Sequence, residues 1–244
     1  MIKGIIFDLG HTLIHLTRAI DEVAREGAEV MAQWYFQKKR IKLDQTALVE
    51  TFLVERAAAW KLAEQNQAEI PIRQTLERAL DRIDAPPAAK AKTLIEAAVK
   101  IYFGPEHAAW QAYPDAVTTL KLLKSRGYQL GLYSNASDDA FVQRLINDNK
   151  LRPELSATFS SAGQGWRKPR PEGFELIAKR WRLPADEIVV VGDSLEADVL
   201  GAQNARMSSI LIGRQPASPT SNEAIKPTAV AENLAALPEM IANL

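Results

Sequence analysis

Apolar and polar residues follow two different rhythms along this chain. The run from Ile2 to Phe7 is short, apolar and β-rich and ends at an aspartate, which predicts a buried strand followed by a loop. From about Thr17 to Trp110, apolar residues instead recur at helical spacing among Ala, Glu, Lys, Arg and Gln. Because Pro71, Pro86 and Pro87 divide this stretch, we expect about four helices and no strand there.

After Pro114, predicted strands and helices alternate. The pattern predicts helices at residues 115–125, 138–147, 171–181 and 195–204 and from Leu237 onward, and strands at residues 128–133, 158–161, 188–191 and 209–212 and near Val230. Residues 214–222 are rich in proline and serine, which predicts a surface loop. Strands that alternate with helices imply a parallel sheet with helices on both faces.

The helical stretch interrupts the α/β pattern directly after its first strand. We therefore expect two domains: an α/β core made of residues 1–15 and 112–244, and an all-helical insertion made of residues 16–111. Ligands of open α/β sheets bind outside the carboxyl ends of the strands. The insertion is predicted to act as a lid over that edge.

Composition narrows the class of protein. The 244 residues include 30 basic and 30 acidic ones, and a formal net charge of zero argues against a broad nucleic-acid-binding face. The absence of cysteine excludes disulfides, thiolate catalysis and zinc–thiolate sites. The N-terminal apolar run is too short for a signal peptide, and no uncharged run reaches the ~18 residues of a membrane span. We expect a cytoplasmic protein with neither a nucleic-acid nor a membrane partner.

Polar side chains of complementary type follow three of the predicted strands: Asp8 after the first, Ser134 and Asn135 after another, and Asp193 and Asp198 after a third. Carboxylates at neighbouring strand ends repel each other unless a cation lies between them, which suggests a magnesium site. Lys168, just before a predicted helix, adds an ammonium group suited to an anion such as phosphate. A carboxylate nucleophile, a metal and a phosphate cradle together fit aspartyl-phosphate chemistry.

These residues fall within four strings that resemble the motifs of the haloacid dehalogenase superfamily. FDLGHTL at residues 7–13 is similar to the first motif, and YSNAS at 133–137, GWRKPRP at 165–171 and VVVGDSLEAD at 189–198 resemble the second, third and fourth. The strings keep the family's order, and the predicted helical insertion lies where the family's cap is inserted. The resemblance implies a Rossmann-like doubly wound parallel sheet with an inserted all-helical cap domain.

Carried over position by position, the resemblance also implies a role for each residue. Asp8 is the nucleophile; Ser134, Asn135 and the catalytic Lys168 bind the phosphoryl group; Asp8, the backbone carbonyl of Gly10 and Asp193 bind Mg²⁺; Thr12 and Asp198 support the first loop and the metal site. The implied activity is that of a magnesium-dependent phosphatase acting on a small phosphorylated metabolite through an aspartyl-phosphate intermediate.

Position 10 departs from the family's phosphatases, which carry there an aspartate that protonates the leaving group and then activates water. Gly10 keeps the carbonyl but loses this acid/base, a function worth about 10²–10⁴-fold in rate. Three explanations stay open. His11 substitutes as the proton donor, since its ordinary pKa of ~6.5 suits neutral pH. Alternatively, the leaving group needs little protonation, as in an acyl phosphate or an anomeric sugar phosphate, or the chain is slow or no longer catalytic.

Competing functions use the same residues. A metal-independent 2-haloacid dehalogenase also lacks the second aspartate, but that class typically has Tyr at position 10 and no counterpart of Asp193. Enzymes that cleave a phosphorus–carbon bond need a Schiff-base lysine from the cap, which the sequence does not identify. A phosphate- or protein-binding homologue without turnover is a further hypothesis. The sequence names neither the substrate nor the oligomeric state.

Overall fold

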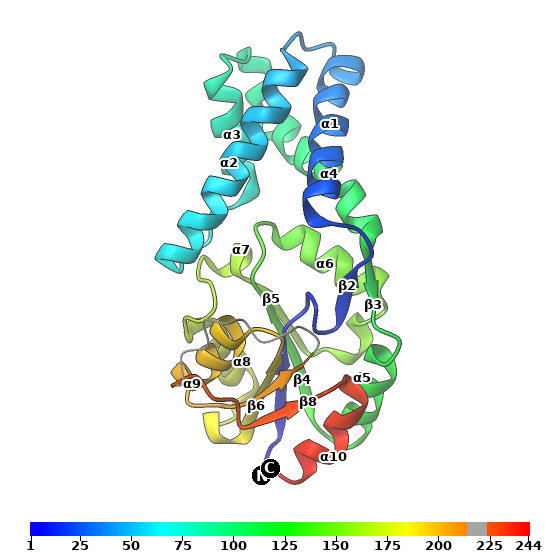
Figure 1. Ribbon diagram of the computed structural model, residues 1–244, viewed down its shortest axis with the longest axis vertical. Helices are drawn as coiled ribbons and strands as arrows, with labels where there is room; N and C mark the ends of the chain where they lie inside the picture. The colour runs from blue at the N-terminus through cyan, green and yellow to red at the C-terminus, as the bar shows by residue number, and fades with distance from the viewer. Residues whose placement is uncertain (214–223) are drawn as a thin grey trace. The chain divides into compact units, whose positions relative to one another are not determined.

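The computed structural model describes residues 1–213 and 224–244 (Figure 1). The loop predicted at residues 214–222 lies outside the described residues. The described chain divides into two compact units, one made of Met1–His15 and Gln111–Leu244 and the other of Leu16–Trp110. Within the described part, no helix is long and apolar enough to cross a membrane.

The first unit is built on a six-stranded sheet in the order β5–β4–β1–β6–β7–β8. Its strands are β1 (Gly4–Phe7), β4 (Gln129–Ser134), β5 (Ala157–Ser160), β6 (Ile188–Gly192), β7 (Ser208–Ile212) and β8 (Ala229–Ala231). All of the strand pairs are parallel. The chain first builds outward from β1 through β4 to β5, and then on the other side through β6 to β8. Ligands of such sheets bind at the carboxyl edge where the order reverses, which here is beside β1.

Helices flank this sheet, as Figure 1 shows for α8 and α9 on one side and α5 on the other. The helices of this unit are α5 (Ala116–Ser125), α6 (Asp139–Asp148), α7 (Ser161–Gln164), α8 (Glu172–Trp181), α9 (Leu200–Asn204) and α10 (Leu237–Ala242). The predicted doubly wound parallel sheet is therefore confirmed.

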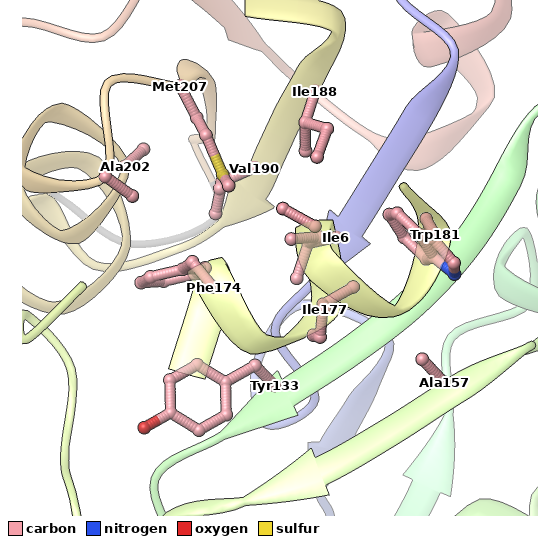
Figure 2. Packing of buried hydrophobic residues seen from close by; sticks show 12 residues of the cluster. Ile6, Tyr133, Ala157, Phe174, Ile177, Trp181, Ile188, Val190, Ala202 and Met207 are labelled. Carbon is pink, nitrogen blue, oxygen red and sulfur yellow. The ribbon is translucent and has the colours of Figure 1, made fainter. Parts of the chain in front are cut away.

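Helix α8 is fixed on the sheet by its aromatic side chains. Phe174 and Trp181 belong to a buried apolar cluster that includes residues of β1, β4 and β6 (Figure 2). The strands leave room for the indole, because a Cβ added at Gly131 would lie 2.7 Å from a ring atom of Trp181. The indole nitrogen also donates a hydrogen bond of 2.9 Å to Ser156 Oγ. This packing holds α8, and with it the loop that precedes the helix.

Short elements escaped the sequence prediction. The strands β2 (Ile14–Leu16) and β3 (Trp110–Ala112), which form a separate two-stranded sheet, were not predicted, because three residues show no periodicity. The expectation of no strand up to Trp110 was therefore wrong by one residue. The helix predicted at 195–204 begins as a wide π-helical turn, Leu195–Val199, before α9.

The second unit contains four α-helices among its described residues, as predicted: α1 (Ile20–Lys39), α2 (Gln45–Asn66), α3 (Ile72–Arg82) and α4 (Lys92–Ala109). Sequence signals set several of the boundaries. Asp44 caps α2 by accepting a hydrogen bond of 2.9 Å from the backbone N–H of Ala47, and Pro71 immediately precedes α3. Helices α1 and α4 approach closely at Gly27, where an added Cβ would lie 2.2 Å from the carbonyl oxygen of Tyr102.

This close approach predicts opposite effects for two glycine substitutions in the helical unit. Alanine favours a helix over glycine by about 1 kcal/mol, an effect that Pro105, the next residue, partly offsets, and apart from its chain neighbours a Cβ at Gly104 of α4 meets nothing within 4 Å. We expect Gly104→Ala to leave the free energy of unfolding unchanged or to raise it slightly. Gly27→Ala forces the two backbones apart and lowers it by about 1–3 kcal/mol. Urea unfolding of both variants checks this, and equal stability of the two would contradict the proposed contact.

Candidate active site

The predicted site residues gather at the carboxyl edge of the sheet. Asp8 directly follows β1, Ser134 is the last residue of β4, and Asp193 directly follows β6. The backbone N–H of Asp8 donates a hydrogen bond of 2.9 Å to the carbonyl oxygen of Val191, which ties the end of β1 to β6. Lys168 reaches the same place from the loop before α8, and the side chains of Asp8, Ser134 and Lys168 are all buried.

Lys168 forms two buried ion pairs. Its Nζ lies 2.5 Å from Asp8 Oδ1 and 2.6 Å from Asp198 Oδ1, and the lysine side chain is only 2% exposed. Burial on its own lowers the pKa of Lys168, but the negative charges of Asp198 and Asp8 outweigh it and hold that pKa above its ordinary value. Lys168 is therefore a permanent cation, and removing one partner of such a buried pair typically costs about 3–5 kcal/mol.

Three carboxylates converge beside this lysine. Asp8, Asp193 and Asp198 each offer an oxygen, and these oxygens lie within 4.8 Å of one another. Burial raises the pKa of Asp193 to about 6, and the charge of Asp198 adds to this shift. Burial likewise raises the pKa of Asp198 to about 6 and raises that of Asp8, in spite of the neighbouring Lys168. Burial is the main cause of the raised values, and the negative charge of a neighbouring carboxylate adds to each of them.

The donor set fits a magnesium ion. When all three carboxylates of the cluster are ionised, the single ammonium of Lys168 leaves two negative charges in excess. A divalent cation matches this excess, and oxygen ligands are the ones that Mg²⁺ prefers. Neighbouring Thr12 is fully buried, and its Oγ1 lies 3.5 Å from Asp193 Oδ1, where it orients that carboxylate.

Asp198 is held by the backbone around it. Its Oδ2 accepts a hydrogen bond of 3.1 Å from the N–H of Ser194, and Ser194 Oγ in turn accepts one of 3.0 Å from the N–H of Ala197. A Cβ added at Gly192 would lie 2.1 Å from the Asp198 carboxylate, so only glycine leaves room for it. The π-helical turn places this carboxylate beside the strand end, and such turns are frequent at functional sites.

Asn135 lies at the edge of the cluster but binds the lysine loop. Its Nδ2 donates to the carbonyl oxygen of Lys168 at 3.1 Å, and its Oδ1 accepts from the N–H of Lys168 at 2.9 Å. The hydroxyl of Tyr133 donates to the carbonyl oxygen of Trp166 at 2.8 Å. The end of β4 thus fixes the loop, so the side chain of Asn135, predicted to bind phosphate, holds Lys168 in place.

The loop after Asp8 contains an unusual conformation. His11 has a φ of 58°, in the left-handed region that residues other than glycine rarely adopt, whereas Gly10 has no positive φ. The imidazole is half-buried, and burial lowers the pKa of His11 in spite of the nearby charge of Asp8. At neutral pH most of the His11 side chains are therefore neutral.

Two residues of this region were missed by the sequence analysis. Ser161 Oγ accepts a hydrogen bond of 2.9 Å from the N–H of Ala136 and donates one of 3.1 Å to the carbonyl oxygen of the same residue, which fixes the loop after β4. A hydroxyl directly after β5 was the available signal. Arg167, beside Lys168, is only 2% exposed, and nothing in the sequence around it distinguishes it from a surface arginine.

Comparisons with known proteins point to one family and two reactions. A family model described as haloacid dehalogenase-like hydrolase matches residues 2–206. Glyceraldehyde 3-phosphate phosphatase of Methanopyrus kandleri is 29% identical over 88% of this chain and 85% of its own length. Phosphoglycolate phosphatase 1 of Pseudomonas aeruginosa is 27% identical over 94% of this chain and 76% of its own. The structure of a 2-haloacid dehalogenase from Pseudomonas syringae pv. Tomato DC3000 has a TM-score of 0.75 at 26% identity, covering 100% of this chain and 99% of its own.

The raised pKa of Asp193 predicts a pH dependence of stability in metal-free buffer. Between its ordinary value of 3.8 and about 6, the folded state holds a proton on Asp193 that the unfolded state has lost. The contribution of Asp193 to the free energy of unfolding of the wild-type protein therefore falls as the pH rises through that interval. Asp193→Asn removes the titration, so the stability of the variant relative to wild type should rise from pH 4 to pH 7. Urea unfolding with a chelator across this range measures the difference, and a constant difference would contradict the raised pKa of Asp193.

Proposed function

Because the chain belongs to the haloacid dehalogenase-like hydrolases, we propose that it is a magnesium-dependent phosphatase of a small phosphorylated metabolite. The observation that carries the proposal is the excess of negative charge in the cluster of Asp8, Asp193 and Asp198 around a single lysine. The metal-independent dehalogenases lack a counterpart of Asp193, and a second carboxylate crowded beside Asp8 has no evident use without a cation. The names of the phosphatase relatives support the same class of substrate.

In the proposed reaction Asp8 is the nucleophile. Its carboxylate oxygen forms a bond to phosphorus while the bond from phosphorus to the leaving oxygen breaks, which leaves an aspartyl phosphate. Water then forms a bond to phosphorus, the bond to Asp8 breaks, and inorganic phosphate is released. Lys168 lies 2.5 Å from Asp8 Oδ1 and would hold the transferring group by its charge. Ser134, buried at the end of β4, is the proposed hydrogen-bond donor to the same group.

Asp8, Asp193 and the backbone carbonyl of Gly10 are the proposed magnesium ligands, with Asp198 as support. When bound, the ion supplies a positive charge that offsets the charge developing on the phosphoryl oxygens. The chain itself supplies orientation: Thr12 holds Asp193, and Ser194 holds Asp198. The helical unit, Leu16–Trp110, is proposed as the cap that selects the substrate. We place this activity in the cytoplasm.

His11 is the proposed proton carrier in place of the missing aspartate. Its pKa is lowered by burial, so its resting form at neutral pH is the neutral imidazole, and once protonated it gives up the proton more readily than an ordinary imidazolium. It would accept one from the attacking water and, once protonated, donate it to the next leaving oxygen. An alkoxide leaving group needs this proton, whereas an acyl phosphate does not.

A 2-haloacid dehalogenase is the second candidate function. The structure named for that reaction, which matches the whole chain at a TM-score of 0.75, favours it, as does the absence of an aspartate at Gly10. In that reaction Asp8 would attack carbon and release halide. The two functions differ in their need for the metal and in the ion released.

An assay of released ions separates the two candidates. We expect phosphate release from a panel of acetyl phosphate, 2-phosphoglycolate and glyceraldehyde 3-phosphate when magnesium is present, and none with a chelator. Asp8→Asn, which keeps the size of the side chain, should lower turnover on the order of 10³-fold or more. Chloride release from 2-chloropropionate with the chelator present would overturn the proposal in favour of the dehalogenase. No release of either ion would favour a binding protein.

His11→Ala should affect substrates according to their leaving groups. Turnover of 2-phosphoglycolate, which leaves as an alkoxide, is expected to fall about 10²–10⁴-fold, while that of acetyl phosphate changes little. Gly10→Asp in the same variant should restore 2-phosphoglycolate turnover, because it supplies a carboxylate acid/base two residues after Asp8 at a position that has no positive φ. Near-normal turnover of both substrates by His11→Ala would remove the histidine from the mechanism.

A further inference from the structure

A cavity lies along β5, the edge strand of the sheet. It has a volume of about 190 Å³ and is lined by residues 155–159 and by two arginines, Arg152 and Arg180. None of these described lining residues is acidic. The cavity therefore concentrates positive charge in a chain whose formal net charge is zero.

This cavity is separate from the candidate active site. The catalytic residues follow the carboxyl ends of the strands, whereas the cavity begins before Ala157, the first residue of β5. Helix α8 starts at Glu172, just after the Lys168 loop, and Arg180 lies in its last turn. At a rise of about 1.5 Å per residue, the backbones of Glu172, beside the Lys168 loop, and of Arg180, beside the cavity, lie about 12 Å apart along the helix.

Arg152 is held in a fixed orientation by neutral groups. Its Nε donates to Asn147 Oδ1 at 3.0 Å, its Nη1 donates to Thr158 Oγ1 at 2.6 Å, and its Nη2 donates to Gln143 Oε1. Thr158 Oγ1 in turn donates to Gln143 Oε1 at 3.1 Å. Since all three acceptors are uncharged, these bonds orient the guanidinium without neutralising it, and they leave two of its N–H groups for a ligand.

The two arginines reach the cavity from opposite faces of the sheet. Arg152 bonds to the side chain of Thr158, and successive side chains of a strand point to opposite faces. Ala157 and Phe159 therefore point the other way, and both pack in the apolar cluster with α8, the helix that carries Arg180. The cavity is therefore lined by one arginine from each side of the edge strand.

We propose that this cavity binds a phosphate group, either inorganic phosphate or the phosphate of a small phosphorylated compound. A dianion matches the charges of two arginines. The four oxygens of phosphate point in different directions, so they can accept hydrogen bonds from two guanidinium groups on different sides. The two oxygens of a planar carboxylate are instead fully bound by one guanidinium group. The volume of about 190 Å³ leaves room for a small organic moiety beside Leu155 and Phe159. The site uses no catalytic residue.

An NMR titration of the intact chain with sodium phosphate tests the proposal. Saturable shifts of the amide signals of residues 155–159 are expected, and sulfate should reproduce them. Arg180 is exposed, so Arg180→Gln should fold normally and weaken phosphate binding at least tenfold. Lys179→Gln, on the same last turn of α8 but outside the cavity, removes an equal charge near the helix end and should bind like wild type.

A second titration, with 2-phosphoglycolate, distinguishes inorganic phosphate from an organic phosphate as the ligand. Tighter binding than that of inorganic phosphate identifies an organic phosphate as the ligand, and weaker binding identifies free phosphate. The proposal is overturned if the shifts do not saturate, if sodium chloride at matched ionic strength reproduces them, or if Arg180→Gln binds as tightly as wild type. Shifts of residues 8–13 in the same spectra report binding at the active site independently.

Discussion

The two buried ion pairs of Lys168 are the interaction on which the rest of the site depends. The lysine joins Asp8 and Asp198, which lie 160 and 30 residues away in the chain, at 2.5 and 2.6 Å. Each of these charges would be costly alone in a buried place. Since one ammonium cannot balance the three carboxylates within 4.8 Å of one another, the site keeps a negative excess. That excess connects the fold to the proposed magnesium chemistry.

The surrounding structure serves to keep this charged cluster rigid. The aromatic residues of α8 anchor the helix behind the lysine loop, and Asn135 holds the backbone of Lys168 at both its N–H and its carbonyl group. Gly192 leaves the space that the carboxylate of Asp198 occupies. Groups held in this way need little rearrangement when charge develops during a reaction.

The extent to which sequence predicted structure differs from element to element. Long apolar runs such as β1 and β6 and the polar residues that follow them were predicted, because burial on both faces of a parallel sheet leaves a continuous signal. Strands of three residues, such as β2, leave none. The contacts of Asn135 with Lys168 and the left-handed φ of His11 depend on tertiary structure, and so does the cavity at Arg152. No local pattern records them.

The most direct test of the central claim is to trap the covalent intermediate. Borohydride added during turnover of acetyl phosphate with magnesium reduces an aspartyl phosphate to homoserine, which mass spectrometry locates in the sequence. We expect homoserine at position 8, and only when both magnesium and the phosphorylated compound are present. Modification at another carboxylate, or phosphate release with Asp8 unmodified, would contradict the role of Asp8 as the nucleophile.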